Sequence, residues 1–226
     1  MNAIFTRESE QLKKSALRLA GEVELRLAEV LKATGARDTE ALQAWVARDA
    51  EIDAREVQIE EECLKILALH QPVARDLRFV VAVLKINNDL ERIGDIVVNI
   101  AERGMRLAAF PATAQQEVCM RMGQIACAML KDSLDALISL DAIKAAAVIA
   151  RDDEVDRLKA AVVDSVAADV TSASTGAAAE ALILIQSVAR DIERIGDHAT
   201  NIAEDVAYLV DGTIIRHKKQ EREAMG

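Results

Sequence analysis

Aromatic residues are scarce in this chain: Phe, Trp and Tyr together make up 2% of its 226 residues. Proline and glycine are also few, with 2 and 9 residues. Folds rich in β-sheet depend on aromatic residues in their strands and on turn residues between them, so this composition argues against such a fold. Alanine, leucine, isoleucine, valine, glutamate and arginine predominate, which is typical of long helices.

Paired cysteines and long apolar runs are absent as well. Cys63, Cys119 and Cys127 form no CxxC motif, which indicates reduced thiols in a cytoplasmic protein. The N-terminal segment has no apolar run followed by a cleavage site, so no secretory signal is expected. The longest apolar stretches, such as Phe79–Leu84, are far shorter than the roughly 20 residues that a membrane span needs. We therefore expect a cytoplasmic location, no membrane insertion, and any membrane association only through a partner.

Positive charge is in deficit, because 28 Lys and Arg residues face 38 Asp and Glu residues, for a net charge of -10. A nucleic-acid-binding protein needs a basic face that neutralises phosphates, so this class is not expected. An acidic surface is compatible instead with cations and with basic patches on partner proteins.

The chain contains an internal duplication. Residues Asp89–Glu102 (DLERIGDIVVNIAE) and Asp191–Glu204 (DIERIGDHATNIAE) are identical at 10 of 14 positions, at an offset of 102. A shorter repeat relates Arg48–Asp53 (RDAEID) to Arg151–Asp156 (RDDEVD) at an offset of 103. Two similar halves are therefore expected.

Breaks in the helical pattern predict six long helices. Side-chain caps are expected at Asp38, Thr113 and Asp141, which would begin the second, fourth and fifth helices. Pro72 should lie in the first turn of the third helix, where its missing N–H costs little. Gly212 should end the sixth helix in a left-handed conformation.

Three helices followed by three helices predict an all-α fold of two tandem three-helix bundles. The expected domains are residues 1–110 and 111–212, followed by a C-terminal tail, 213–226, that should fray. The second helix is expected to run unbroken to about Leu69. Helices of roughly 25–35 residues would be about 40–50 Å long, so the molecule should be elongated.

Acidic residues stand one helical turn apart in both halves. The four pairs are Asp49/Asp53, Glu91/Asp95, Asp152/Asp156 and Glu193/Asp197. Like charges at this spacing destabilise a helix by about 0.2–0.5 kcal/mol per pair, yet the chain repeats the arrangement at corresponding places. A shared hard cation would compensate for the repulsion. A solvated helix face accounts for the same residues without a metal, and both interpretations stay open.

Two glycines occupy equivalent mid-helix positions, Gly94 and Gly196. A glycine there costs about 1 kcal/mol relative to alanine, so we expect a neighbouring helix to approach closely at both. Common descent of the two halves is the alternative explanation.

Histidines are too few for the common metalloenzyme sites. A ferritin-like di-iron enzyme needs two Glu-x-x-His pairs, and no Glu stands three residues before His70, His198 or His217. A zinc hydrolase is poorly supplied for the same reason. His198 follows Asp197, but its counterpart in the first half is Ile96, so a ligand role shared by both halves is not expected. No nucleophile with an adjacent base and no Gly-rich phosphate loop is evident, and we do not expect an enzyme.

Several segments resemble the PhoU family of accessory regulators of high-affinity phosphate transport. They are 91–95 (ERIGD), 193–204 (ERIGDHATNIAE), 59–78 (IEEECLKILALHQPVARDLR) and 209–217 (LVDGTIIRH). The resemblance covers nearly the whole chain, from about Ala44 to His217. It implies two similar three-helix bundles and, as in some members, metal clusters held on the bundle surface by a repeated acid-x-x-x-Asp motif.

The resemblance also implies which residues hold metal. They are Asp49, Asp53, Glu91 and Asp95 in the first half, and Asp152, Asp156, Glu193 and Asp197 in the second. The implied ions are iron, zinc or another divalent cation. Glu56 and Glu60 extend the first acidic stripe, whereas Lys159 and Val163 occupy the corresponding places in the second. The second site is therefore expected to be weaker or to hold a different number of ions.

The function implied by the resemblance is negative regulation of phosphate-starvation signalling. The implied partners are the ATPase subunit of the phosphate ABC transporter, a sensor histidine kinase and a second copy of the chain in a homodimer. The residues themselves favour action through protein contact. The alternative is a carboxylate-bridged metalloenzyme or a metal-storage helical protein.

Overall fold

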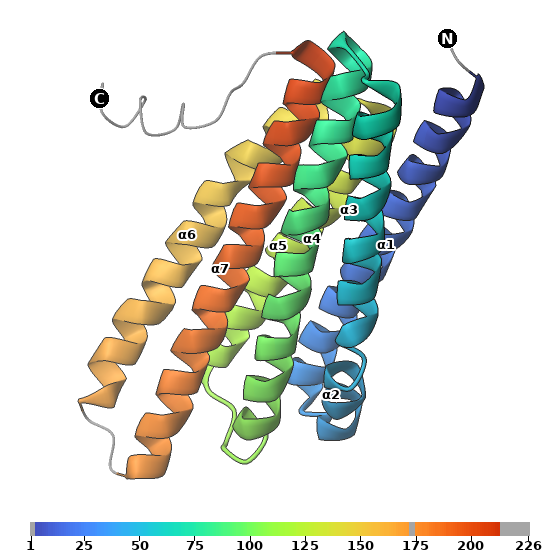
Figure 1. Cartoon of the computed structure of the whole chain (residues 1–226). Coiled ribbons are helices and arrows are strands. Elements are labelled where there is room, and N and C mark those ends of the chain that lie inside the picture. The colour runs from blue at the N-terminus through green and yellow to red at the C-terminus, as the bar shows by residue number, and fades with distance from the viewer. Residues whose placement is uncertain (1–2, 172–174, 213–226) are drawn as a thin grey trace.

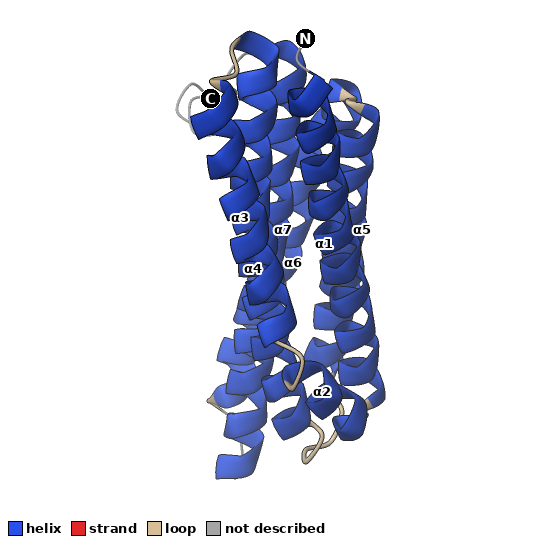
Figure 2. Ribbon diagram, turned by 45° about the vertical axis from the view of Figure 1, so that its right-hand side comes forward, coloured by secondary structure: helices blue, strands red, loops and turns tan. Residues whose placement is uncertain are grey.

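The computed structural model describes residues 3–171 and 175–212, which form helices and connecting loops with no strand among them (Figures 1 and 2). The six long helices are α1 (Ala3–Ala36), α3 (Ala50–His70), α4 (Ala74–Leu107), α5 (Ala114–Ser139), α6 (Ala142–Val170) and α7 (Gly176–Asp211). A short helix, α2 (Thr39–Val46), lies between α1 and α3. The predicted all-α fold is confirmed, whereas the predicted fraying tail, 213–226, lies outside the described residues.

The long helices form two three-helix bundles side by side. One contains α1, α3 and α4, and the other contains α5, α6 and α7. Helices α4 and α7 run antiparallel along each other at the centre of the molecule, and α1 packs against α5 (Figure 1). Buried residues from both bundles, including Ile93 of α4 and Ile195 of α7, belong to one continuous apolar core. The two halves therefore stabilise each other.

The predicted helix caps are confirmed. Asp38, Thr113 and Asp141 each accept a hydrogen bond from a backbone N–H two or three residues further on, which satisfies free donors of the first turn. Gly212 ends α7 with φ 72°, and its N–H donates to the carbonyl of Tyr208. A residue with a Cβ would be strained in this left-handed conformation.

The prediction of an unbroken second helix was wrong. Residues 47–49 separate α2 from α3, and the N–H of Asp49 donates to the carbonyl three residues back instead of four. Tertiary packing accounts for the separation, because Leu42 is fully buried and the ring of Trp45 lies 5.8 Å from the guanidinium of Arg26. Asp49 makes no capping hydrogen bond at the start of α3, so its carboxylate is available for other contacts.

The predicted position of Pro72 was also wrong. Helix α3 ends at His70 with Gln71 in the left-handed region, and α4 begins only at Ala74. Pro72 therefore lies in the connection before α4 and outside its first turn. Val73 is extended, with φ -128° and ψ 161°, and provides no side-chain cap.

The two mid-helix glycines differ in their surroundings. A Cβ built on Gly94 would lie 3.1 Å from Cδ1 of Ile52, so α3 approaches α4 closely there, as expected. The nearest atom to a Cβ on Gly196 is Oδ1 of Asp152 at 3.6 Å, which is ordinary contact. Close approach thus explains the first glycine but not the second.

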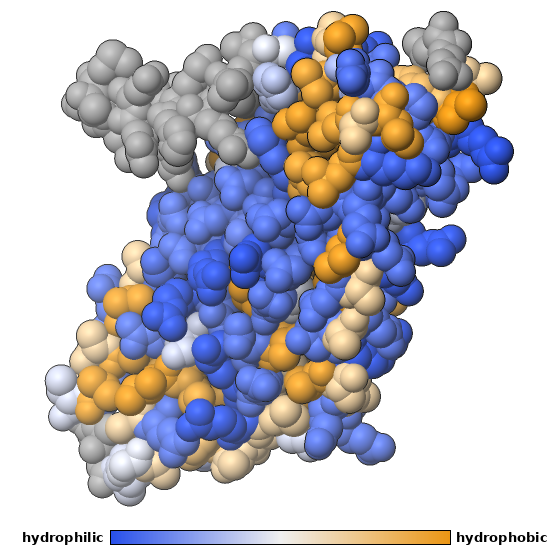
Figure 3. Space-filling view, viewed as in Figure 1, coloured by the Kyte–Doolittle hydropathy of each residue, from blue (hydrophilic) through white to orange (hydrophobic). Residues whose placement is uncertain are grey.

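Hydrophilic side chains predominate over the middle of the face formed by α3, α4, α6 and α7, and apolar areas lie nearer its two ends (Figure 3). None of the helices in the described part of the chain combines the length and the apolarity that a membrane crossing requires.

Candidate metal centre

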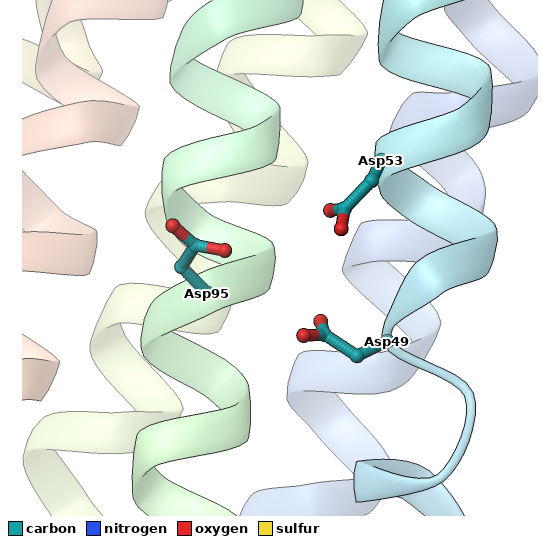
Figure 4. A group of neighbouring side chains, drawn as sticks. All are labelled: Asp49, Asp53 and Asp95. Carbon is teal, nitrogen blue, oxygen red and sulfur yellow. The ribbon is translucent and has the colours of Figure 1, made fainter.

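Three carboxylates of the first half converge between α3 and α4. Asp49 and Asp53 lie one turn apart at the start of α3, and Asp95 faces them from α4 (Figure 4). One carboxylate oxygen from each of the three lies within 4.8 Å of the others. We call this set the Asp49–Asp53–Asp95 cluster.

The electrostatics of the cluster are those of acids that repel one another. Burial raises the pKa of Asp49, and the charges of Asp53 and Asp95 raise it further. Burial likewise raises the pKa of Glu91, followed by the charge of Asp95. A cation among these carboxylates would convert the repulsion into attraction.

Glu91 lies beside the cluster but is not one of its three converging residues. The guanidinium of Arg92 is 3.4 Å from Glu91 and 3.6 Å from Asp95, with 53% of its side chain exposed. Such an exposed pair is weak and readily exchanged with water. Among the described residues, no basic side chain lies within 4.0 Å of the carboxylates of Asp49 or Asp53.

Arg26 of α1, which no sequence motif marked, is fully buried and interacts electrostatically with the cluster. Its Nη2 is 3.5 Å from carboxylate oxygens of both Glu22 and Glu51, and the charges of Asp49 and Asp53 also act on it. The available signal was a single charged residue on the otherwise apolar face of α1. The ion pairs of Arg26 are with glutamates outside the cluster, and its Nε and Nη1 have no hydrogen-bond partner in the part of the chain that the structure describes.

The acids of the second half are arranged differently. Desolvation raises the pKa of Asp197 to about 6, with Glu193, Asp152 and Asp156 adding to the shift, although Asp197 itself remains exposed. The ammonium of Lys159, however, donates to Oε1 of Glu193 at 2.8 Å. Within the described residues, only the Asp49–Asp53–Asp95 cluster brings three such ligand atoms within 4.8 Å.

The chemistry of the first cluster suits a hard cation. Three carboxylates without a histidine or cysteine match the oxygen ligands that Mg²⁺, Mn²⁺ and Ca²⁺ prefer. A closed tetrahedral zinc site would require nitrogen or sulfur ligands that the cluster lacks. The donor set therefore fits a divalent ion that keeps several water ligands.

His198, which follows the second-half acid Asp197, is used in the contact between the bundles. Its Nδ1 lies 2.8 Å from Oδ1 of Asp89, and the amide of Asn201 donates to the same oxygen at 3.2 Å. The histidine therefore joins α7 to α4, and its role is not shared with Ile96 in the first half.

The chain is similar to proteins of one known family. The family model described as the PhoU domain matches the chain twice, at residues 16–104 and 119–206. A curated relative from Caulobacter vibrioides, named phosphate-specific transport system accessory protein PhoU homolog, is 37% identical over 92% of this chain and 90% of its own length. A relative of the same name from Deinococcus radiodurans is 42% identical over 73% of this chain and 76% of its own.

Two solved structures share the fold over most of its length. The crystal structure of PhoU from Pseudomonas aeruginosa has a TM-score of 0.88 and 34% identity, covering 92% of this chain and 100% of that one. The phosphate transport system regulatory protein PhoU from Streptococcus pneumoniae has a TM-score of 0.85 and 27% identity, covering 93% and 99%.

Proposed function

Because the chain belongs to the PhoU family, we propose that it regulates phosphate uptake as an accessory protein of a phosphate transport system. The observation that carries this function is the agreement over nearly the whole length, in sequence and in fold, with proteins named as phosphate transport accessory or regulatory proteins. The chain is a regulator and not an enzyme, in keeping with those names.

The finer part of the proposal concerns the partners. The chain would act from the cytoplasm on the ATPase subunit of the phosphate ABC transporter and on a sensor histidine kinase. A net charge of -10 and a hydrophilic face along the central helices support contact with basic patches on such proteins (Figure 3). Association of this kind should weaken as salt rises, because salt screens exposed charges. The homodimer implied by the resemblance remains a prediction, which light scattering on the purified protein would test.

We also propose that the Asp49–Asp53–Asp95 cluster binds a divalent cation. The support is the convergence of three carboxylates that no basic side chain within 4.0 Å compensates at Asp49 or Asp53. A cation held there would tie the start of α3 to the middle of α4. The ion would act as a structural clamp, which suits a protein that works through its surface.

Deletion of the gene in its own host tests the regulatory function. Expression of phosphate-starvation genes should rise in phosphate-rich medium and return to normal when the chain is supplied again. Purified protein should also bind the transporter ATPase or the kinase in a salt-sensitive way. Normal repression in the deletion strain, together with no binding to either protein, would contradict the regulatory function and favour the metalloprotein alternative. Oxygen-consumption and ferroxidase assays on the purified protein would then test that alternative directly.

A further inference from the structure

The two halves differ at the two positions that extend their acidic stripes, where Glu56 and Glu60 of the first half correspond to Lys159 and Val163 of the second. The offset of 103 that relates Asp49 to Asp152 and Asp53 to Asp156 places Lys159 opposite Glu56. The four acid pairs themselves are retained, so the second half keeps these carboxylates and has a positive side chain in place of the negative Glu56. The net change at this position is two units of charge.

In the second half, Lys159 lies among the retained acids. Its Nζ is 2.8 Å from Oε1 of Glu193, and it is attracted in addition by Asp156 and Asp197. The hydrogen bond to Glu193 is the main cause that raises the pKa of Lys159, so the side chain stays a cation. The lysine crosses from α6 to α7, which are the helices that a bridging metal would join.

In the first half, Glu56 has a different environment. Its Oε1 accepts a hydrogen bond of 3.0 Å from the amide of Asn87, and Ala189 occupies the position equivalent to that asparagine. Burial raises the pKa of Glu56, followed by repulsion from Glu60 and Asp53. The first half therefore gathers negative charge around its cluster where the second half places a compensating ammonium.

We propose that Lys159 is the resident cation of the second half, so that this half does not bind a metal and exchangeable divalent cations bind only in the first. The proposal rests on the metal centre proposed above for the Asp49–Asp53–Asp95 cluster. The ammonium of Lys159 is part of the chain, so it compensates the nearby carboxylates at any metal concentration. The contact between α6 and α7 therefore does not depend on metal, whereas the metal-mediated contact between α3 and α4 does.

Metal titration of the purified full-length chain with Mn²⁺ tests the assignment, with electron paramagnetic resonance counting the bound ions. The unchanged chain should bind Mn²⁺ at one place, and Asp49→Asn with Asp95→Asn should abolish binding. Lys159→Glu should add a second binding event that Glu193→Gln removes again. The mirror-image change, Glu56→Lys, should reduce Mn²⁺ affinity in the first half at least tenfold, and Glu56→Gln should reduce it less.

One outcome overturns the proposal directly. If Asp152→Asn with Asp156→Asn lowers the Mn²⁺ bound by an otherwise unchanged chain, the second half holds metal in the presence of Lys159. The same conclusion follows if Lys159→Glu leaves the number of bound ions unaltered.

A second measurement needs no metal at all. In metal-free buffer, Lys159→Gln should lower the unfolding temperature by several degrees, because it removes the ion pair with Glu193. Lys131→Gln is the matched control, since Lys131 forms an exposed pair with Asp135 on its own helix and should matter little. An unchanged unfolding temperature for Lys159→Gln would contradict the role of resident cation.

If the unchanged chain binds no Mn²⁺, the metal centre proposed in the first half is wrong, and the unfolding temperature alone decides the role of Lys159. The regulatory function is judged separately by gene expression.

Discussion

Asp89 and Asp191 occupy equivalent positions in the two halves, and each binds across the interface to the opposite half. Oδ1 of Asp89 on α4 lies 2.8 Å from Nδ1 of His198 and accepts a hydrogen bond of 3.2 Å from the amide of Asn201. Both of these partners belong to α7. Asp191 of α7 is paired with Arg103 of α4. Both aspartates are buried, so these contacts are shielded from water and set how α4 lies along α7. The two equivalent aspartates thus both link the bundles, but through different partner residues.

Arg103→Leu should destabilise the protein strongly. The substitution leaves the buried carboxylate of Asp191 without its partner, and breaking a buried pair in this way costs about 3–5 kcal/mol. Urea unfolding followed by circular dichroism measures the loss. Arg106→Leu is the control on the same helix, because its pair with Glu180 is exposed and should contribute about 1 kcal/mol or less. Equal losses in the two variants would contradict the importance of the buried contact.

Gly94→Ala and Gly196→Ala should have opposite effects. At Gly196 the new Cβ meets only ordinary contacts, so the helix gains up to about 1 kcal/mol of propensity. At Gly94 it would lie 3.1 Å from buried Ile52, and overpacking of this kind costs about 1–3 kcal/mol. Thermal unfolding of the two single variants measures the difference. If both variants were stabilised equally, α3 would move to accommodate the new Cβ at Gly94 without strain, and the predicted overpacking would be wrong.

The cysteines should react slowly in the native protein. Burial raises the pKa of Cys63 and of Cys119 from 9.0 to about 12, and that of Cys127 to about 11. The reactive thiolate is therefore rare at pH 8, and a disulfide reagent should modify the thiols quickly only after unfolding. Fast reaction of the folded protein would contradict this burial.

The same thiols predict a loss of stability at alkaline pH. A pKa that is higher in the folded state means that the unfolded chain releases its protons first as pH rises. The contribution of the three thiols is therefore complete below about pH 9 and is lost as pH rises toward 12. Urea unfolding across this range measures the decline. Replacement of Cys119 by alanine should make the decline shallower, apart from a constant loss due to the cavity.

Asp49→Asn should stabilise the metal-free protein and weaken its response to Mn²⁺. Asp49 is repelled by Asp53 and Asp95, and a neutral amide relieves that repulsion. In the unchanged chain, Mn²⁺ at about 100 times its Kd should add about 2.7 kcal/mol of stability, and the variant should lose most of this gain. Differential scanning calorimetry with and without Mn²⁺ provides the measurement. Asp164→Asn, at an exposed position of α6, should change neither quantity.

Four helix boundaries were predictable because they depend on neighbouring residues, whereas the start of α4 near Pro72 was not. The caps Asp38, Thr113 and Asp141 act within one turn, and Gly212 adopts the left-handed conformation that only a residue without Cβ takes easily. The separation of α2 from α3 was not predictable in this way. It depends on the burial of Leu42 and on packing with residues distant in the chain.

The sequence by itself determined the helical fold, the duplication and the acid pairs, because each is a periodic pattern within a short stretch of chain. Only the tertiary structure decided which acids converge. Asp95 joins Asp49 and Asp53, whereas Glu91 on the same helix lies beside them. The contact between the ammonium of Lys159 and Oε1 of Glu193, at 2.8 Å, also became visible only in the tertiary structure, because the two residues lie 34 positions apart in the chain. The physical reason is that charge interactions depend on distances between helices, which core packing sets and which no single helix encodes.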